Sequence, residues 1–128
     1  MCGVDLSTCD GDGHVVVVLC GELDMAAAAG VAAALAAAAA SGPLVIVDLA
    51  GLRFIDASGV AALVRGRKQA RQAGGDLLLA APRRQMLRVL ALTRLIGVFP
   101  VHASVDEAAR SAGQSRRAAR RPVPAALT

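Results

Sequence analysis

The chain has 128 residues, a length typical of one domain and sufficient to enclose a hydrophobic core. Only 2% of the residues are aromatic, so the core must consist mainly of aliphatic side chains. Phe54 and Phe99 are the two aromatic rings on which bases could stack, which argues against a protein that binds single-stranded nucleic acid. The net charge of +4 is carried by the four arginines of segment 114–128. The remaining chain has 10 cations and 10 anions, so its charges balance and a strongly basic folded domain is not expected.

Two extended segments are predicted near the N-terminus. The β-branched run Val15–Leu19 follows a turn cluster and is typical of a strand, and Val4–Leu6 is suited to pair with it at a sheet edge. The cysteines, Cys2, Cys9 and Cys20, lack the spacing of a metal cluster and fit a reduced compartment. Because no basic stretch precedes an apolar segment here, we expect no secretory signal and a cytoplasmic protein.

An alanine-rich helix is predicted over Met25–Ala40. Asp24 is suited to cap its first turn, and Ser41-Gly42-Pro43 is suited to end it. The stretch carries no charge, but it is shorter than the about 20 predominantly apolar residues that a membrane span needs. We therefore expect a helix of a water-soluble domain, with Val31 and Leu35 as its main core contacts.

A buried central strand is predicted at Leu44–Val47, closed by Leu49. Its apolar run is unbroken, as in sheets that are covered on both faces. Asp56 stands where the N-cap of a following helix belongs, because its short side chain accepts hydrogen bonds from free backbone N–H groups. The next three residues then form the first helical turn, which includes the hydroxyl of Ser58.

The helix after Asp56 has one face suited to close packing on a sheet. The residues of this stripe are mostly small: Gly59, Leu63, Gly66, Ala70 and Ala73. Ser58 lies roughly 140° around the axis from the middle of the stripe, so we expect it to point to solvent. Val60 and Val64 lie between the stripe and the cations Arg67, Lys68 and Arg71, and they belong either to the margin of the core or to an exposed apolar strip.

A further strand and helix are predicted next. Gly74-Gly75 ends the preceding helix with residues that tolerate positive φ, and Leu77–Ala81 forms the strand. Pro82 is suited to the first position of the next helix. That helix is expected to have an apolar face made of Met86, Leu87, Leu90 and Ala91, and a basic face made of Arg83, Arg84 and Arg88.

The last predicted elements are a short strand and a closing helix. Val98–Val101 contains Pro100 and is therefore expected at a sheet edge. Ser104 and Glu107 have the spacing of a capping box for a helix that continues to about Ala112. Alternation of strands and helices with short connections predicts an α/β domain whose sheet is mixed but mostly parallel, with about four helices.

The sequence shows no recognisable arrangement of catalytic residues. Ser58 lacks the flanking glycines of a hydrolase nucleophile, and neither histidine, His14 or His102, is expected near it. The sequence has no phosphate-cradling glycine motif of either common type and no cluster of metal ligands. We therefore expect a protein that is not an enzyme and that needs no metal or cofactor.

Three blocks of the sequence resemble a known family. They are GELD at Gly21–Asp24, VDLAGLRFIDASGVAALV at Val47–Val64 and AGGDLLLA at Ala73–Ala80. In this order and spacing they resemble a STAS domain of the anti-sigma factor antagonist type, over about Val15–Arg110. The resemblance implies one STAS domain, placed at 1–113, followed by the basic segment 114–128, for which composition predicts disorder.

The resemblance also implies a role for Ser58. In such proteins the serine at this position is phosphorylated by a partner anti-sigma factor that is also a serine kinase, and the unphosphorylated form binds that partner and releases the sigma factor. Asp56, Ser58 and Gly59 match the family pattern, whereas Ala57 stands where a second serine is common.

The expected partner surface combines the first block with the start of the central helix. Loops at the carboxyl ends of parallel strands share one edge of a sheet, so the two regions meet if the first long strand runs parallel to the central one. The residues of this predicted surface are Glu22, Asp24, Asp56, Ala57, Ser58, Gly59, Val60 and Val64.

Two other functions remain open. One is a constitutive STAS interaction domain, a scaffold or a small-ligand sensor, in which Ser58 only begins a helix. The other, ranked last, is a nucleic-acid binder that acts through the basic segment and Arg83, Arg84 and Arg88. The expected partner is an anti-sigma factor, with a phosphatase left open, no direct nucleic-acid or membrane contact, and a monomer or weak dimer.

Overall fold

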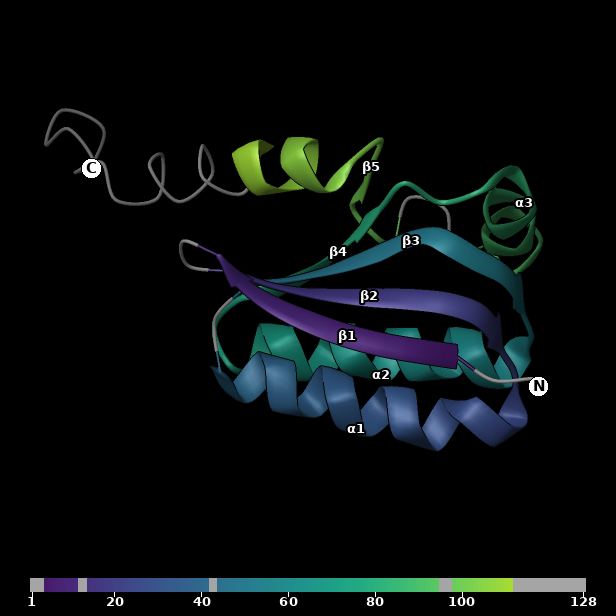
Figure 1. The fold of residues 1–128 in the computed structure, drawn as a ribbon, viewed down its shortest axis with the longest axis horizontal. Helices are drawn as coiled ribbons and strands as arrows, with labels where there is room; N and C mark the ends of the chain where they lie inside the picture. Colours follow the sequence, from purple (N-terminus) through teal and green to yellow (C-terminus); the bar gives the residue numbers. More distant parts are fainter. Residues whose placement is uncertain (1–3, 12–13, 42–43, 95–97, 112–128) are drawn as a thin grey trace, which may run out of the picture.

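The computed structural model describes residues 4–11, 14–41, 44–94 and 98–111. Within these segments five strands form one sheet in the order β1-β2-β3-β4-β5 (Figure 1). β1 is antiparallel to β2, and β2 to β5 are parallel to one another, so the predicted mixed, mostly parallel sheet is confirmed. The elements are β1 (Val4–Gly11), β2 (His14–Leu23), α1 (Met25–Ser41), β3 (Leu44–Ile55), α2 (Ala57–Gln72), β4 (Asp76–Ala80), α3 (Arg84–Leu92) and β5 (Val101–His102). A closing helix spans 105–111.

The two faces of the sheet have separate apolar clusters. α1 and α2 lie side by side along one face (Figure 1), and Val31 and Leu35 of α1 are fully buried there, as predicted. Successive residues of a strand point to opposite faces, so Val45 and Val47 join this cluster while Ile46 joins the other one. The second face is covered by the closing helix through the buried Ala108 and its partly buried neighbours. Burial on both faces explains the unbroken apolar runs.

The two central strands are longer than their apolar runs indicated. β2 continues through Gly21–Leu23, beyond the predicted Val15–Leu19, and β3 continues to Ile55. The two extensions pair with each other, with Glu22 opposite Phe54 and register shifts before and after Gly21. Hydrogen bonds between two strand ends therefore keep these residues extended, although their side chains do not alternate regularly.

The start of α3 differs from the prediction. The helix begins at Arg84, after the N-cap Arg83, so Pro82 precedes the helix and does not open it. Ala81 has a φ of 54°, and this turn displaces the helix start from the proline. Of the predicted apolar face, Met86 and Leu90 are buried, Leu87 is half-buried and Ala91 is exposed. The helix rests on the rest of the domain along a narrow stripe.

The edge position of the last strand is confirmed. β5 is limited to Val101–His102, which pair with Leu79 and Ala80 of β4. Half of the predicted capping box forms, since Ser104 Oγ accepts a hydrogen bond of 3.0 Å from the backbone N–H of Glu107. The Glu107 carboxylate lies 3.6 Å from His102 Nδ1, which draws it away from the helix start. Ala112 and the basic segment 114–128 lie outside the described residues.

Each helix in the described segments falls short of the length and apolar character that crossing a membrane requires.

Candidate functional site

The carboxyl ends of β2 and β3 lie next to each other. Leu23 and Ile55 are register partners in a parallel pair, and the backbone N–H of Asp56 donates to the carbonyl of Leu23 over 3.1 Å. Asp24 and Asp56, the residues that follow the two strands, therefore share one edge of the sheet. The expectation that the first block and the central helix meet depended on a parallel β2, and the structure has this orientation.

The carboxylate of Asp56 bonds to two helices. Its Oδ1 accepts a hydrogen bond of 3.0 Å from the backbone N–H of Gly59 and so caps α2, as predicted. Its Oδ2 accepts a second one of 3.1 Å from the backbone N–H of Met25, at the start of α1. Asp24 caps α1 from its own chain position, accepting from the Ala27 N–H at 3.1 Å. Two helix N-termini, each with partial positive charge, are thus joined by the carboxylate of Asp56, and the carboxylate of Asp24 adds a cap to α1.

Ser58 lies in a groove between α1 and α2. Its side chain is in the first turn of α2, and the residue is half-buried, so the expected orientation toward open solvent is only partly right. The described residues that line this α1–α2 groove, of about 340 Å³, are Met25, Ala28, Ala29, Ala32, Ser58, Ala61, Ala62 and Arg65. A helical projection of α2 alone does not reveal the groove, because its second wall is α1.

Gly59 allows α2 to start very close to the strand ends. A Cβ atom at this position would lie 2.6 Å from a Leu23 side-chain carbon and 2.7 Å from an Ile55 side-chain carbon. Real Cβ atoms do not approach other atoms so closely, so glycine is required by the packing. The close approach at Gly59 therefore sets the distance between the first turn of α2, which contains Ser58, and the ends of the strands.

The two valines of the predicted partner surface have different surroundings. Val60 is 6% exposed and belongs to the core cluster, whereas Val64 is 39% exposed. Both line a shallow second groove on the outer side of α2, together with Ala57, Ala61, Arg65, Lys68 and Thr93. Of the predicted buried stripe, Ala73 is exposed, because α2 has ended there and Gly74, with a φ of 93°, turns the chain away.

The structure adds a cleft that sequence reasoning missed. It lies between the end of β3 and α3, and it is lined by Leu52, Arg53, Phe54, Ile55, Gln85, Met86 and Val89. The apolar residues after Gly51 were the available signal, but the pattern did not show that α3 packs beside them. Of the two aromatic residues, Phe54 is half exposed at this cleft and Phe99 is buried. Glu22, half-buried, is the register partner of Phe54.

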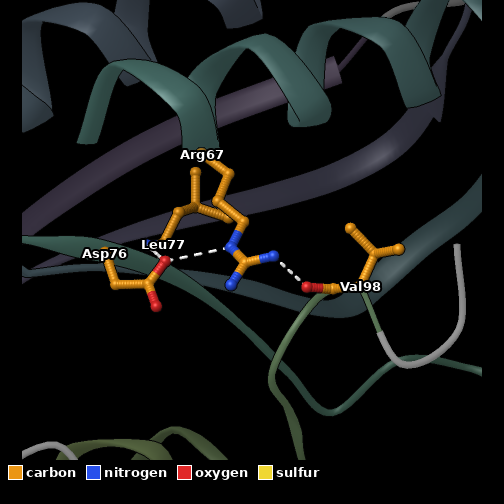
Figure 2. A network of polar contacts seen from close by, with 4 residues as sticks. All are labelled: Arg67, Asp76, Leu77 and Val98. Atoms are coloured by element: carbon orange, nitrogen blue, oxygen red, sulfur yellow. Dashed lines mark hydrogen bonds and ion pairs between the residues drawn. The ribbon is translucent and has the colours of Figure 1, made fainter. Parts of the chain in front are cut away.

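The basic residues are divided among several surfaces. Arg83, Arg84 and Arg88 are exposed, as predicted, but Arg83 Nε also donates to the Ala50 carbonyl over 2.8 Å. Arg67 is not a free surface cation: its Nε donates to Asp76 Oδ1 at 3.0 Å, and its Nη1 donates to the Val98 carbonyl (Figure 2). The same guanidinium lies 5.9 Å from the centre of the Phe99 ring. Arg67 therefore connects α2 to β4 and to the segment before β5, away from Ser58.

The sequence and the fold are similar to known proteins. The STAS domain family model matches residues 8–108. No curated protein matches the sequence. An anti-sigma factor antagonist from Mycobacterium paratuberculosis is 26% identical, with a TM-score of 0.77 over 85% of this chain and 93% of that chain.

Two forms of another anti-sigma factor antagonist, SpoIIAA, are also similar. Its unphosphorylated form is 25% identical, with a TM-score of 0.70 over 81% of this chain and 92% of that chain. The phosphorylated form of the Bacillus protein is 25% identical, with a TM-score of 0.65 over 84% and 97%. Part of the murine anion transporter Solute Carrier 26 family member A9 shares the fold alone, at 18% identity and a TM-score of 0.71, over 82% of this chain and 18% of the transporter.

Proposed function

We propose that this chain, which belongs to the STAS domain family, is an anti-sigma factor antagonist switched off by phosphorylation of Ser58. In its unphosphorylated state it binds an anti-sigma factor with serine kinase activity and thereby releases a sigma factor for bacterial transcription in the cytoplasm. The chain is the substrate of that kinase and not itself an enzyme. The observation that carries the proposal is the position of Ser58, in the first turn of α2 and in a groove open to solvent.

The relatives support this assignment at the level of the family. The mycobacterial relative is an anti-sigma factor antagonist, and SpoIIAA is known in both an unphosphorylated and a phosphorylated form. Ser58 is the hydroxyl of this chain that follows the helix-capping Asp56 and precedes Gly59, whose close packing holds the turn in place. A modification there changes the surface beside the strand ends and leaves the core untouched.

Phosphorylation of Ser58 changes charge at a sensitive place. The Oγ atom forms a bond to the γ-phosphorus of ATP, the bond from that phosphorus to ADP breaks, and the hydroxyl proton leaves to solvent or to a base of the kinase. The phosphoserine carries a charge of about −1.5 to −2 at pH 7. The helix N-terminus favours this charge by about 0.3–1 kcal/mol and the neighbouring Asp56 opposes it, so the effect on the fold is small.

The effect on the interface is large by comparison. The partner surface is formed by Asp24, Asp56 and Ala57 at the strand ends, with Glu22 beside them and Val64 further along α2 as its exposed apolar member. Val60 and Gly59 support this surface from below, since both are buried. Enclosing an unpaired dianion between two proteins costs several kcal/mol in desolvation, and each 1.4 kcal/mol is about tenfold in affinity.

The first experiment tests the modification. The purified chain is incubated with each anti-sigma factor kinase of its source organism and ATP, and its mass is measured. We expect an increase of about 80 Da, the mass of one phosphoryl group, that Ser58→Ala abolishes. An increase that persists in Ser58→Ala moves the modification to another residue, and no increase with any such kinase contradicts the proposed switch.

The second experiment tests binding. Calorimetric titration compares the parent chain, Ser58→Ala and Ser58→Asp with the anti-sigma factor as titrant. We expect the parent and Ser58→Ala to bind alike, and Ser58→Asp to bind at least about tenfold more weakly, one step of 1.4 kcal/mol. Equal affinities of all three proteins would leave Ser58 without a role in the interface.

A second candidate function is a STAS interaction or small-ligand domain without a switch. The observation that favours it is the β3–α3 cleft with the half-exposed Phe54 at its wall. In this alternative the partner contacts depend on the cleft, and Phe54→Ala weakens binding while the Ser58 variants do not. Adding Phe54→Ala to the calorimetric titrations separates the two functions, because weaker binding of Ser58→Asp supports the switch and weaker binding of Phe54→Ala alone supports this alternative.

A further inference from the structure

The α1–α2 groove has a hydroxyl near one end and a guanidinium toward the other. Ser58 and Arg65 both line it, and they lie two helical turns apart on α2, about 10 Å along the axis. Residues at this spacing share one face of a helix, so both side chains approach the groove from the same side.

The space between these two residues is lined by small side chains. Ala61 and Ala62 separate them on α2, and three alanines, Ala28, Ala29 and Ala32, form the facing wall on α1. A helical side chain leans toward the N-terminus of its helix, and Ser58 lies on that side of Arg65, so the groove offers the guanidinium a path toward the serine. The methyl groups of these alanines leave room for the Arg65 side chain in the groove, whereas longer side chains would fill it.

Arg65 is available for an ionic partner. It is exposed, and among the described residues no hydrogen bond or ion pair engages it. The nearby Arg67 is already bonded to Asp76 and to the Val98 carbonyl. Arg65 is also the one charged side chain among the described residues that line the groove.

The surroundings of Ser58 otherwise oppose a phosphate group. The Asp56 carboxylate is two residues away and the Asp24 carboxylate lies at the start of α1, while the residues of α1 in the groove carry no charge. The N–H groups at the starts of the two helices are partly taken, because those of Gly59 in α2 and Met25 in α1 donate to Asp56. A cation on the groove side is therefore the available counterion.

We infer that Arg65 is the intramolecular partner of phosphorylated Ser58, its guanidinium donating to the phosphate oxygens along the α1–α2 groove. This inference rests on the proposed function, which supplies the phosphate. Arginine suits the task because its planar fork of donors matches phosphate oxygens. The contact lays the Arg65 side chain over the alanine-lined groove, so the switched-off state both carries a phosphate and covers the groove beside Ser58.

The test uses the full chain with phosphoserine incorporated at position 58 during translation. The pKa of the phosphate is measured by phosphorus NMR titration for the parent, Arg65→Gln and Arg71→Gln. A cation beside the phosphate favours the dianion, so we expect a lower phosphate pKa in the parent than in Arg65→Gln. Arg71→Gln is the matched control, because it removes the same charge from the same helix at an exposed residue about 20 Å from Ser58 along the axis.

The outcomes are distinct. A higher pKa in Arg65→Gln together with a parent-like Arg71→Gln supports the contact, and Arg65→Lys is then expected to restore part of the shift because it keeps the charge and loses the planar fork. Equal pKa values in the parent and Arg65→Gln, or equal shifts in both glutamine variants, overturn it. No kinase is needed, so a chain that kinases fail to phosphorylate refutes the proposed function without touching this result, and the reverse also holds.

Discussion

Asp56 accepts hydrogen bonds from the first turns of two helices that are separated in the sequence by the whole of β3. One carboxylate thereby fixes the relative position of α1 and α2 at the edge where Ser58 lies. A carboxylate suits this place because both of its oxygens accept, whereas an amide offers one acceptor and one donor group. The residue therefore acts on the groove and on the helix caps together.

This geometry predicts a graded effect of Asp56 variants on stability. In Asp56→Asn the amide oxygen still caps Gly59, but the NH₂ group replaces the oxygen that accepts from the Met25 N–H. We therefore expect the free energy of unfolding to fall by about 0.5–2 kcal/mol, the usual contribution of one cap. Asp56→Ala removes both caps and loses more. Urea unfolding measures the series, with Asp48→Asn as the control because, within the described part of the chain, Asp48 accepts from the nearby Ala50 N–H alone. Asp56→Asn with the stability of the parent would show that the Met25 contact contributes nothing.

At the scale of elements, glycines of the two neighbouring helices have opposite surroundings. Gly59 packs against Leu23 and Ile55 at distances that exclude a Cβ atom, whereas a Cβ atom at Gly30 of α1 meets nothing within 4 Å. Both are helical residues, so their intrinsic preferences are similar and the difference arises from packing alone.

We therefore predict opposite signs for the same substitution. Gly30→Ala stabilises the protein by about 0.5–1 kcal/mol, since alanine loses less backbone freedom on forming a helix. Gly59→Ala destabilises it by about 1–3 kcal/mol, because α2 must shift away from the strand ends. Thermal unfolding of the two variants and the parent decides the matter. A stable Gly59→Ala protein that binds its partner normally would show that the close approach is dispensable.

At the scale of the whole molecule, Arg67 connects parts of the chain that meet only in the folded domain. It reaches from α2 to Asp76 at the start of β4 and to the carbonyl of Val98 (Figure 2), and its guanidinium lies 5.9 Å from the centre of the Phe99 ring. The side chains of the Arg67–Asp76 pair are 16% and 31% exposed, so solvent screens this pair less than a pair on the open surface. The network holds the edge strand β5 onto the domain at a distance from the groove.

Arg67→Gln is expected to loosen this edge and to leave the groove unchanged. Hydrogen bonds to charged groups contribute about 1.5–3 kcal/mol each, so we expect a loss of that order. A double-mutant cycle with Asp76→Asn measures the pair, and hydrogen exchange is expected to rise in 98–102. The exposed Arg71→Gln serves as the control and changes stability by less than about 0.5 kcal/mol. Faster exchange at Ser58, or weaker partner binding in Arg67→Gln, would contradict this separation.

Much of the local structure could be predicted from residue patterns. Apolar runs indicated the buried strands, Asp24 and Asp56 indicated the helix starts, and Gly74 indicated the end of α2, because caps and strand alternation depend on near neighbours in the chain. The family resemblance, now confirmed by the family match over 8–108, pointed to Ser58. The strand and helix-end predictions follow from interactions within a few residues, whereas Ser58 was identified from the resemblance.

Other features depended on how the elements pack. The second hydrogen bond of Asp56, the partial cover of Ser58 by α1, the burial of Val60 and the bond from Arg67 to the Val98 carbonyl all depend on elements that are separated in the sequence. A helical projection gives the direction of a side chain, but it does not show which residues of another helix or strand lie in that direction. The sequence by itself thus determined which elements form and where α1 and α2 begin, since periodicity and local capping hydrogen bonds decide that. Only the tertiary structure decided which side chains share a groove, because register and docking result from the packing of the whole domain.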